Sequence, residues 1–168
     1  IEHCMLLPEA LLDELVRVGA SPSFHIDHLF YYGDALADSI VGAERAARLL
    51  PVRAAFEHGL APTLHADSPM FPAAPFHLMR TAVLRTTRSG RVLGAEQGIT
   101  VEQALRALTI HGARQLGVEP ELGSLEAGKW ADLVVVSADP HAVAPEALDG
   151  IEVLEVWVAG RRQDRSAR

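Results

Sequence analysis

The sequence predicts an α/β protein in which parallel βαβ units are followed by a small module of β-strands. Within residues 1–66, short apolar segments alternate with segments of helical periodicity, and this alternation favours parallel strands joined by helices. Residues 121–162 instead combine a turn-rich segment with two apolar runs, which is typical of a β-rich module. The chain has 168 residues, of which 49% are hydrophobic, so it is long enough to bury the core of one domain.

The first βαβ unit is predicted at residues 1–24. Residues 1–4 have the pattern of the end of a buried strand, and residues 20–24 that of a second, short strand. Between them, residues 8–18 place leucine and valine near helical spacing, with Pro8 in the first turn and Gly19 just past the end. These features predict a surface helix that joins the two strands.

The second unit is predicted to contain a helix at residues 51–58, closed by Gly59, and a strand at residues 61–66. Residues 26–50 separate the two units and are long for a strand-to-helix connection. Connections of this length are typically functional or disordered loops, so we expect a loop here.

Two further helices are predicted after the second unit, at residues 75–87 and 100–116. Thr100 and Gln103 have the spacing of a capping box, which predicts where the second of these helices begins.

The end of the chain is predicted to form the β-module. Its strands are expected at residues 131–137 and 151–159. The polar residues 161–168 are expected to form a frayed tail.

Charge and cysteine content restrict the possible functions. Fifteen Lys and Arg residues against 22 Asp and Glu give a net charge of −7, which argues against nucleic-acid or membrane binding, because both need a basic surface. No apolar run approaches the roughly 20 residues of a membrane span, and the first residues lack the basic-then-apolar order of a signal peptide. The single cysteine, Cys4, excludes an internal disulfide and a multi-cysteine zinc site, so we expect a cytoplasmic protein that acts on small molecules.

Polar side chains follow the predicted parallel strands where each strand ends. His3, His25 and Asp67 occupy such positions, and the carboxyl ends of parallel strands meet at one opening. Imidazole and carboxylate together suit a metal centre, in which the carboxylate binds the ion or accepts a proton from its water. The alternative is structural: His3 as a hydrogen-bonded strand-end residue and Asp67 as a turn former.

Other residues are candidate substrate contacts. His65 shares one side of its strand with Asp67, and the connection after the first unit contributes further polar and aromatic side chains. The candidates are His25, His28, Tyr31 and His65, with loop or core packing as the alternative. Structural roles are expected for the remaining histidines and the cysteine, namely His58, His77, His111, His141 and Cys4.

Five segments together resemble the closing part of the amidohydrolase superfamily, specifically the YtcJ-like group of amidohydrolase family 3. They are "IEHC", "PSFHIDHLFYYGD", "TLHADSPM", "ITVEQALRALTIHGARQLG" and "GSLEAGKWADLVVVSADP". The resemblance covers the chain from Ile1 to about Arg161. It implies that residues 1–120 are strands six to eight, with their helices, of a (β/α)₈ TIM-type barrel, that residues 121–162 belong to a small β-sandwich, and that residues 163–168 are a tail.

The resemblance also implies roles for individual residues. His3 corresponds to a metal-ligand histidine, and Asp67 to an aspartate that binds metal and acts as acid and base. The expected cofactor is a divalent metal, zinc, as one or two ions, with the remaining ligands outside this chain. Ala66, Ser68 and His65 depart from the family's usual residues around the aspartate, which leaves the substrate open.

The function implied by the resemblance is metal-dependent hydrolysis of amide-like carbon–nitrogen bonds other than peptide bonds. A deaminase of the same superfamily and a non-catalytic interaction or regulatory fragment are the alternatives. Because a (β/α)₈ barrel needs about 250 residues, we expect this chain to be a C-terminal fragment, inactive alone, that associates with the missing N-terminal part or into a homo-oligomer through its open edges.

Overall fold

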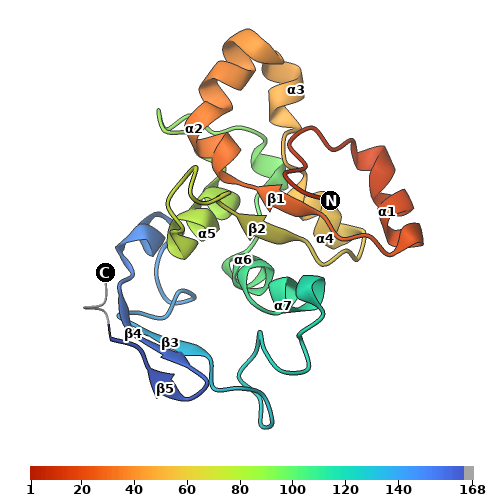
Figure 1. Cartoon of the computed structure of the whole chain (residues 1–168). Helices are drawn as coiled ribbons and strands as arrows, with labels where there is room; N and C mark the ends of the chain where they lie inside the picture. Colours follow the sequence, from red (N-terminus) through yellow and green to blue (C-terminus); the bar gives the residue numbers. More distant parts are fainter. Residues whose placement is uncertain (165–168) are drawn as a thin grey trace.

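The computed structural model describes residues 1–164 and contains two small β-sheets, of which one lies among the helices and the other at one end of the molecule (Figure 1). Strands β1 (Ser23–His25) and β2 (Thr63–His65) pair in parallel, with Phe24 opposite Leu64. Strands β3 (Leu133–Val136), β4 (Val153–Val158) and β5 (Arg161–Arg162) form an antiparallel sheet. The α/β class is confirmed, and the described residues do not close a barrel.

The N-terminal segment differs from its prediction. Residues 1–4 form no regular strand, because the chain turns at once: His3 and Cys4 both have positive φ, at 67° and 50°. The segment still lies along β1, since the carbonyls of Ile1 and His3 accept hydrogen bonds from the N–H groups of Ser23 and His25. It therefore places His3 beside the end of β1.

The first predicted helix is present. A 3₁₀ turn at Glu9–Leu11 leads into α1 (Leu12–Val18), and the chain leaves this helix at Gly19 with φ 68°. Glycine suits this left-handed position because it has no Cβ.

The loop predicted at residues 26–50 is wrong, because most of this segment is helical. Helix α2 (Asp27–Ala35) continues into a π-helical turn, Leu36–Ile40, and is followed by α3 (Ala43–Ala47). The buried residues recur with a helical period that the polar and aromatic residues between them obscured; they are Leu29, Gly33, Leu36 and Ala37. The segment is thus a rigid element beside the site.

The helices that follow agree with the prediction except at their ends. Helix α4 (Val52–Glu57) precedes β2, and α5 (Pro75–Leu84) ends at Leu84, three residues earlier than predicted. The Thr100–Gln103 capping box is confirmed at the start of α6 (Val101–Leu108).

The predicted helix at residues 100–116 is two helices. The break is at Thr109, between α6 and α7 (Ile110–Leu116), where φ is −125° and ψ is −94°. The Thr109 hydroxyl donates to the Leu105 carbonyl at 2.7 Å, a bond from threonine to the preceding turn that is known to bend helices.

The β-module is present, with one addition. β3 and β4 are the two predicted strands, and β4 turns back at Ala159 and Gly160, both with positive φ, into β5. The expectation of a frayed tail is therefore wrong for Arg161 and Arg162, because a two-residue turn of this kind matches the twist of a hairpin. Residues 165–168 of the expected tail lie outside the described part of the chain.

The hydrophobic core lies against the parallel strands, and the side chain of Arg85 is buried in it. Phe24, Leu49 and Leu50 are fully buried, and so is the Arg85 side chain. Its guanidinium donates to the carbonyls of Leu49, Leu50 and Leu93 at 2.6, 3.1 and 3.1 Å. Among residues 1–164, no helix is long and apolar enough to cross a membrane.

Candidate metal centre

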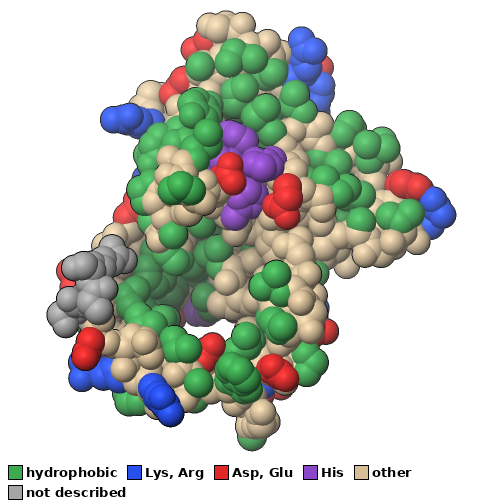
Figure 2. All heavy atoms as spheres, viewed as in Figure 1, with side chains coloured by type: hydrophobic (Ala, Val, Ile, Leu, Met, Phe, Trp, Pro, Cys, Tyr) green, Lys and Arg blue, Asp and Glu red, His purple; other side chains and the backbone are tan. Residues whose placement is uncertain are grey.

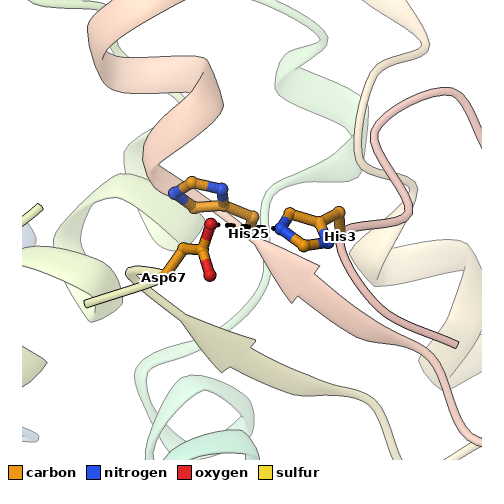
Figure 3. Close-up of side chains that lie close together, drawn as sticks. All are labelled: His3, His25 and Asp67. Atoms are coloured by element: carbon orange, nitrogen blue, oxygen red, sulfur yellow. Dashed lines mark hydrogen bonds and ion pairs between the residues drawn. The ribbon is translucent and has the colours of Figure 1, made fainter. Parts of the chain in front are cut away.

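The candidate site lies at the carboxyl ends of the two parallel strands (Figure 3). His25 is the last residue of β1, and Asp67 comes two residues after the end of β2. His3 reaches the same place from the segment that lies along β1. The expected convergence of these three residues is therefore found, although residues 1–4 do not form the regular strand that was expected to carry His3.

His3 and Asp67 face each other directly. Nε2 of His3 and Oδ2 of Asp67 lie 3.2 Å apart, and both side chains are almost half exposed, at 46% and 44%. The hydrogen bond from His3 lowers the pKa of the Asp67 carboxyl, so this group is ionised at neutral pH. Both residues have positive φ, which non-glycine residues seldom adopt and which often marks a functional site.

His25 is the buried member of the group. It is 0% exposed, and burial followed by the neighbouring His28 lowers its pKa to about 4. Its ring is therefore neutral at physiological pH and keeps a free lone pair. One donor atom each from His3, His25 and Asp67 lie within 4.8 Å of one another.

Two more imidazoles extend the cluster. The His28 ring centroid is 3.9 Å from that of His25, and the His65 centroid is 5.1 Å from it. Burial lowers the pKa of both rings. Figure 2 shows a patch of histidine side chains with acidic side chains beside it, and Nε2 of His65 lies 3.7 Å from the carboxylate of Glu2.

Tyr31 stands apart from the histidines. Its ring stacks on Phe71, with centroids 4.2 Å apart and planes within 4° of parallel. Phe71 in turn lies 5.5 Å from the His25 ring. Phe71 and Glu2 were missed from the sequence, although both lie within four residues of a predicted ligand.

An open pocket of about 320 Å³ adjoins Asp67. His65 and Asp67 contribute polar groups to its wall, and the rest is mostly apolar: Ala66, Ser68, Ala73, Pro75 and Leu78. Its volume is within the range of small-molecule sites, at about 300–1,000 Å³.

The histidines expected to be structural lie away from this cluster. His58 pairs with Asp13 at 2.7 Å, and Nδ1 of His111 lies 3.0 Å from the Pro62 carbonyl. His141 pairs with Glu102 and Asp139, and His77 lies between Asp27 and Asp149. Cys4 is buried, and burial raises the pKa of its thiol.

A sequence model of the amidohydrolase family matches residues 1–163. The chain belongs to the amidohydrolase family. Among amidohydrolase relatives, it is 38% identical over 113 residues to the N-substituted formamide deformylase of Arthrobacter pascens, covering 67% of this chain and 21% of that protein. It is 31% identical over 164 residues to Protein LONG AFTER FAR-RED 3 of Arabidopsis thaliana, covering 96% of this chain and 28% of that protein. The chain thus spans less than a third of either relative.

Solved amidohydrolase-like structures share the fold. A metal-dependent hydrolase from Pyrococcus horikoshii superposes with a TM-score of 0.75 at 25% identity, over 87% of this chain and 30% of that one. An adenosine deaminase from Xanthomonas campestris, solved with bound zinc, superposes with a TM-score of 0.68 at 24% identity, over 96% of this chain and 36% of that one. The membership in amidohydrolase family 3 is confirmed, and the narrower YtcJ-like grouping stays a prediction.

Proposed function

We propose that this chain supplies part of the active site of a metal-dependent hydrolase that cleaves amide-like carbon–nitrogen bonds other than peptide bonds. The observation that carries the proposal is the 3.2 Å approach of His3 and Asp67, which are 64 residues apart in the chain. Family membership supports the same reading, because it makes hydrolysis of such bonds the expected chemistry.

The donor atoms fit a divalent ion. Two ligands on one tetrahedral zinc ion, each roughly 2.0–2.2 Å from it, lie about 3.4 Å apart. The 3.2 Å between Nε2 of His3 and Oδ2 of Asp67 is close to that separation. Nitrogen and oxygen donors suit zinc, so we infer zinc as the metal, with one or two ions and further ligands supplied from outside residues 1–168.

Each residue has a separate task in this mechanism. A bound divalent ion would lower the pKa of its water to about 7, which would let the water attack at neutral pH. His3 would hold the ion through its ring nitrogen. Asp67, which is ionised because of its low pKa, takes the proton of the attacking water and delivers it to the leaving nitrogen.

The substrate is inferred to be a small molecule. The pocket beside Asp67 has the size for one, and His65 lines it, where its ring can donate a hydrogen bond to substrate. The centroid of the His28 ring lies 6.0 Å from that of the His3 ring, and His28 is a second candidate contact. The Arthrobacter pascens relative is named for deformylation of N-substituted formamides, which contain a non-peptide amide. N-substituted amides are therefore the first substrates to test.

A deaminase is the second candidate. The chain is 46% identical over 55 residues to the 5-methylthioadenosine/S-adenosylhomocysteine deaminase of Moorella thermoacetica. Such a reaction would use the same base and metal on a ring carbon that carries an amino group.

The test uses the longest natural polypeptide that contains this chain, with His3→Ala and Asp67→Asn. We expect His3→Ala to lower the bound zinc, measured by elemental analysis, and Asp67→Asn to lower turnover of formamides at least 100-fold. Normal metal content and turnover in both variants would reject the proposal and leave the non-catalytic role. Release of ammonia from aminopurines without formamide cleavage would favour the deaminase.

A further inference from the structure

Among residues 1–164, neither nitrogen of the His25 ring has a hydrogen-bond partner. The side chain is 0% exposed. Native proteins rarely leave a buried polar group without a partner, because the loss of its contacts with water is then uncompensated. A group not present among these residues therefore has to satisfy at least one of the two nitrogens.

The position of the ring indicates what that group is. A ring nitrogen of His25 belongs to the set of donor atoms, with His3 and Asp67, that lie within 4.8 Å of one another. Within residues 1–164 neither His28 nor His65 joins such a set of three. In Figure 3 the His25 ring lies next to the Asp67 carboxylate.

The burial of His25 favours a role as a metal ligand over a role as a substrate contact. His3 and Asp67 are nearly half exposed, whereas His25 is fully buried beside them. A substrate that enters from solvent meets the exposed His3 and Asp67 before the buried His25 ring. An ion bound between the three side chains would contact a donor atom of each.

We propose that His25 is a third protein ligand of the ion held by His3 and Asp67. This inference rests on the proposed function and changes the expected role of His25 from substrate contact to metal ligand. The His28 ring packs against this side chain, with its centroid 3.9 Å from that of the His25 ring at a tilt of 45°.

The first test measures zinc alone, in competition with a chromophoric chelator, on the longest natural polypeptide that contains this chain. His25→Phe keeps a planar ring and removes both unpartnered nitrogens, so we expect the fold to persist and the zinc affinity to fall by more than about tenfold. His111→Phe is the matched control, because His111 is another buried histidine and lies outside the donor set. Its zinc affinity should equal that of the parent.

The second test does not depend on loss of binding. His25→Cys replaces one donor by a thiolate, and cobalt(II) bound to thiolate absorbs in the near ultraviolet. We expect this absorption in the cobalt-loaded His25→Cys protein and not in the parent or in His28→Cys.

The results of these tests distinguish the role of His25 from the proposed function itself. Unchanged zinc affinity in His25→Phe, or no thiolate absorption in His25→Cys, while His3→Ala loses zinc, would overturn the inference and leave the proposed function intact. If His3→Ala also keeps its zinc affinity, the proposed function itself fails.

Discussion

The rings of Tyr31 and Phe71 lie parallel to within 4°, with centroids 4.2 Å apart, and join helix α2 to the loop that carries Asp67. Phe71 is four residues beyond Asp67, in a turn closed by a hydrogen bond from the Ser68 hydroxyl to its carbonyl. The pair therefore ties the position of the loop that carries Asp67 to helix α2.

Removing the ring of Phe71 should loosen that loop. For Phe71→Ala we expect a loss of about 1–3 kcal/mol in the free energy of unfolding, from buried apolar area and the stacked pair. Phe71→Leu should recover part of it. Urea denaturation measures both, and equal stability of Phe71→Ala and the parent would show that the stack contributes nothing.

Gly33 should tolerate no side chain. A Cβ at this position would lie 2.7 Å from Cγ2 of Thr87 and 2.9 Å from Cδ1 of Leu93, so Gly33→Ala should destabilise the protein by about 1–3 kcal/mol. Gly112→Ala is the control, because Gly112 is also helical and no atom lies within 4 Å of the place its methyl group would occupy. Thermal denaturation should show a lower Tm for the first variant and an equal or higher Tm for the second.

Arg85 should be irreplaceable by lysine. Its three nitrogens satisfy three buried carbonyls, and a single ammonium cannot reach them all. We expect Arg85→Lys to lose about 2–4 kcal/mol of stability, as carbonyls are left without donors. A loss below about 0.5 kcal/mol in chemical denaturation would contradict this role.

Asp27 should make stability depend on pH. It is 1% exposed, and burial raises its pKa from 3.8 to about 6, with His77 opposing the shift. The folded state therefore holds a proton that the unfolded state releases between about pH 4 and 6, so this contribution to stability is full below pH 3.8 and is lost as pH rises through 6. Each pKa unit corresponds to about 1.4 kcal/mol.

The matching variant is Asp27→Asn, which cannot ionise. Relative to the parent, it should gain about 2–3 kcal/mol of stability between pH 4 and pH 7, because only the parent must bury a charge at the higher pH. Denaturant unfolding of both proteins at pH 4 and at pH 7 measures this gain in the free energy of unfolding. The effects of other titrating groups cancel, because they are common to the two proteins. Parallel pH profiles for the two proteins would contradict it.

Residue patterns were sufficient to predict β1 to β4, the capping box and the meeting of His3, His25 and Asp67, since these depend on local periodicity and on parallel strands ending at one edge. The helical character of residues 27–47 was missed, because His28, Tyr31 and Asp34 made a helix with a narrow buried face look like a polar loop. The break at Thr109 depends on a single hydroxyl bond to Leu105, which sequence periodicity does not encode. The unpartnered nitrogens of His25 are a property of packing and could be found only in three dimensions.

The proposed function requires that His3 and Asp67 bind one metal ion at the carboxyl ends of the parallel strands. Anomalous X-ray diffraction at the zinc edge, from zinc-soaked crystals of the longest natural polypeptide that contains this chain, tests it directly. We expect an anomalous-difference peak roughly 2.0–2.2 Å from Nε2 of His3 and from the Asp67 carboxylate. A peak elsewhere, or none at this site with zinc bound at other positions, would contradict it.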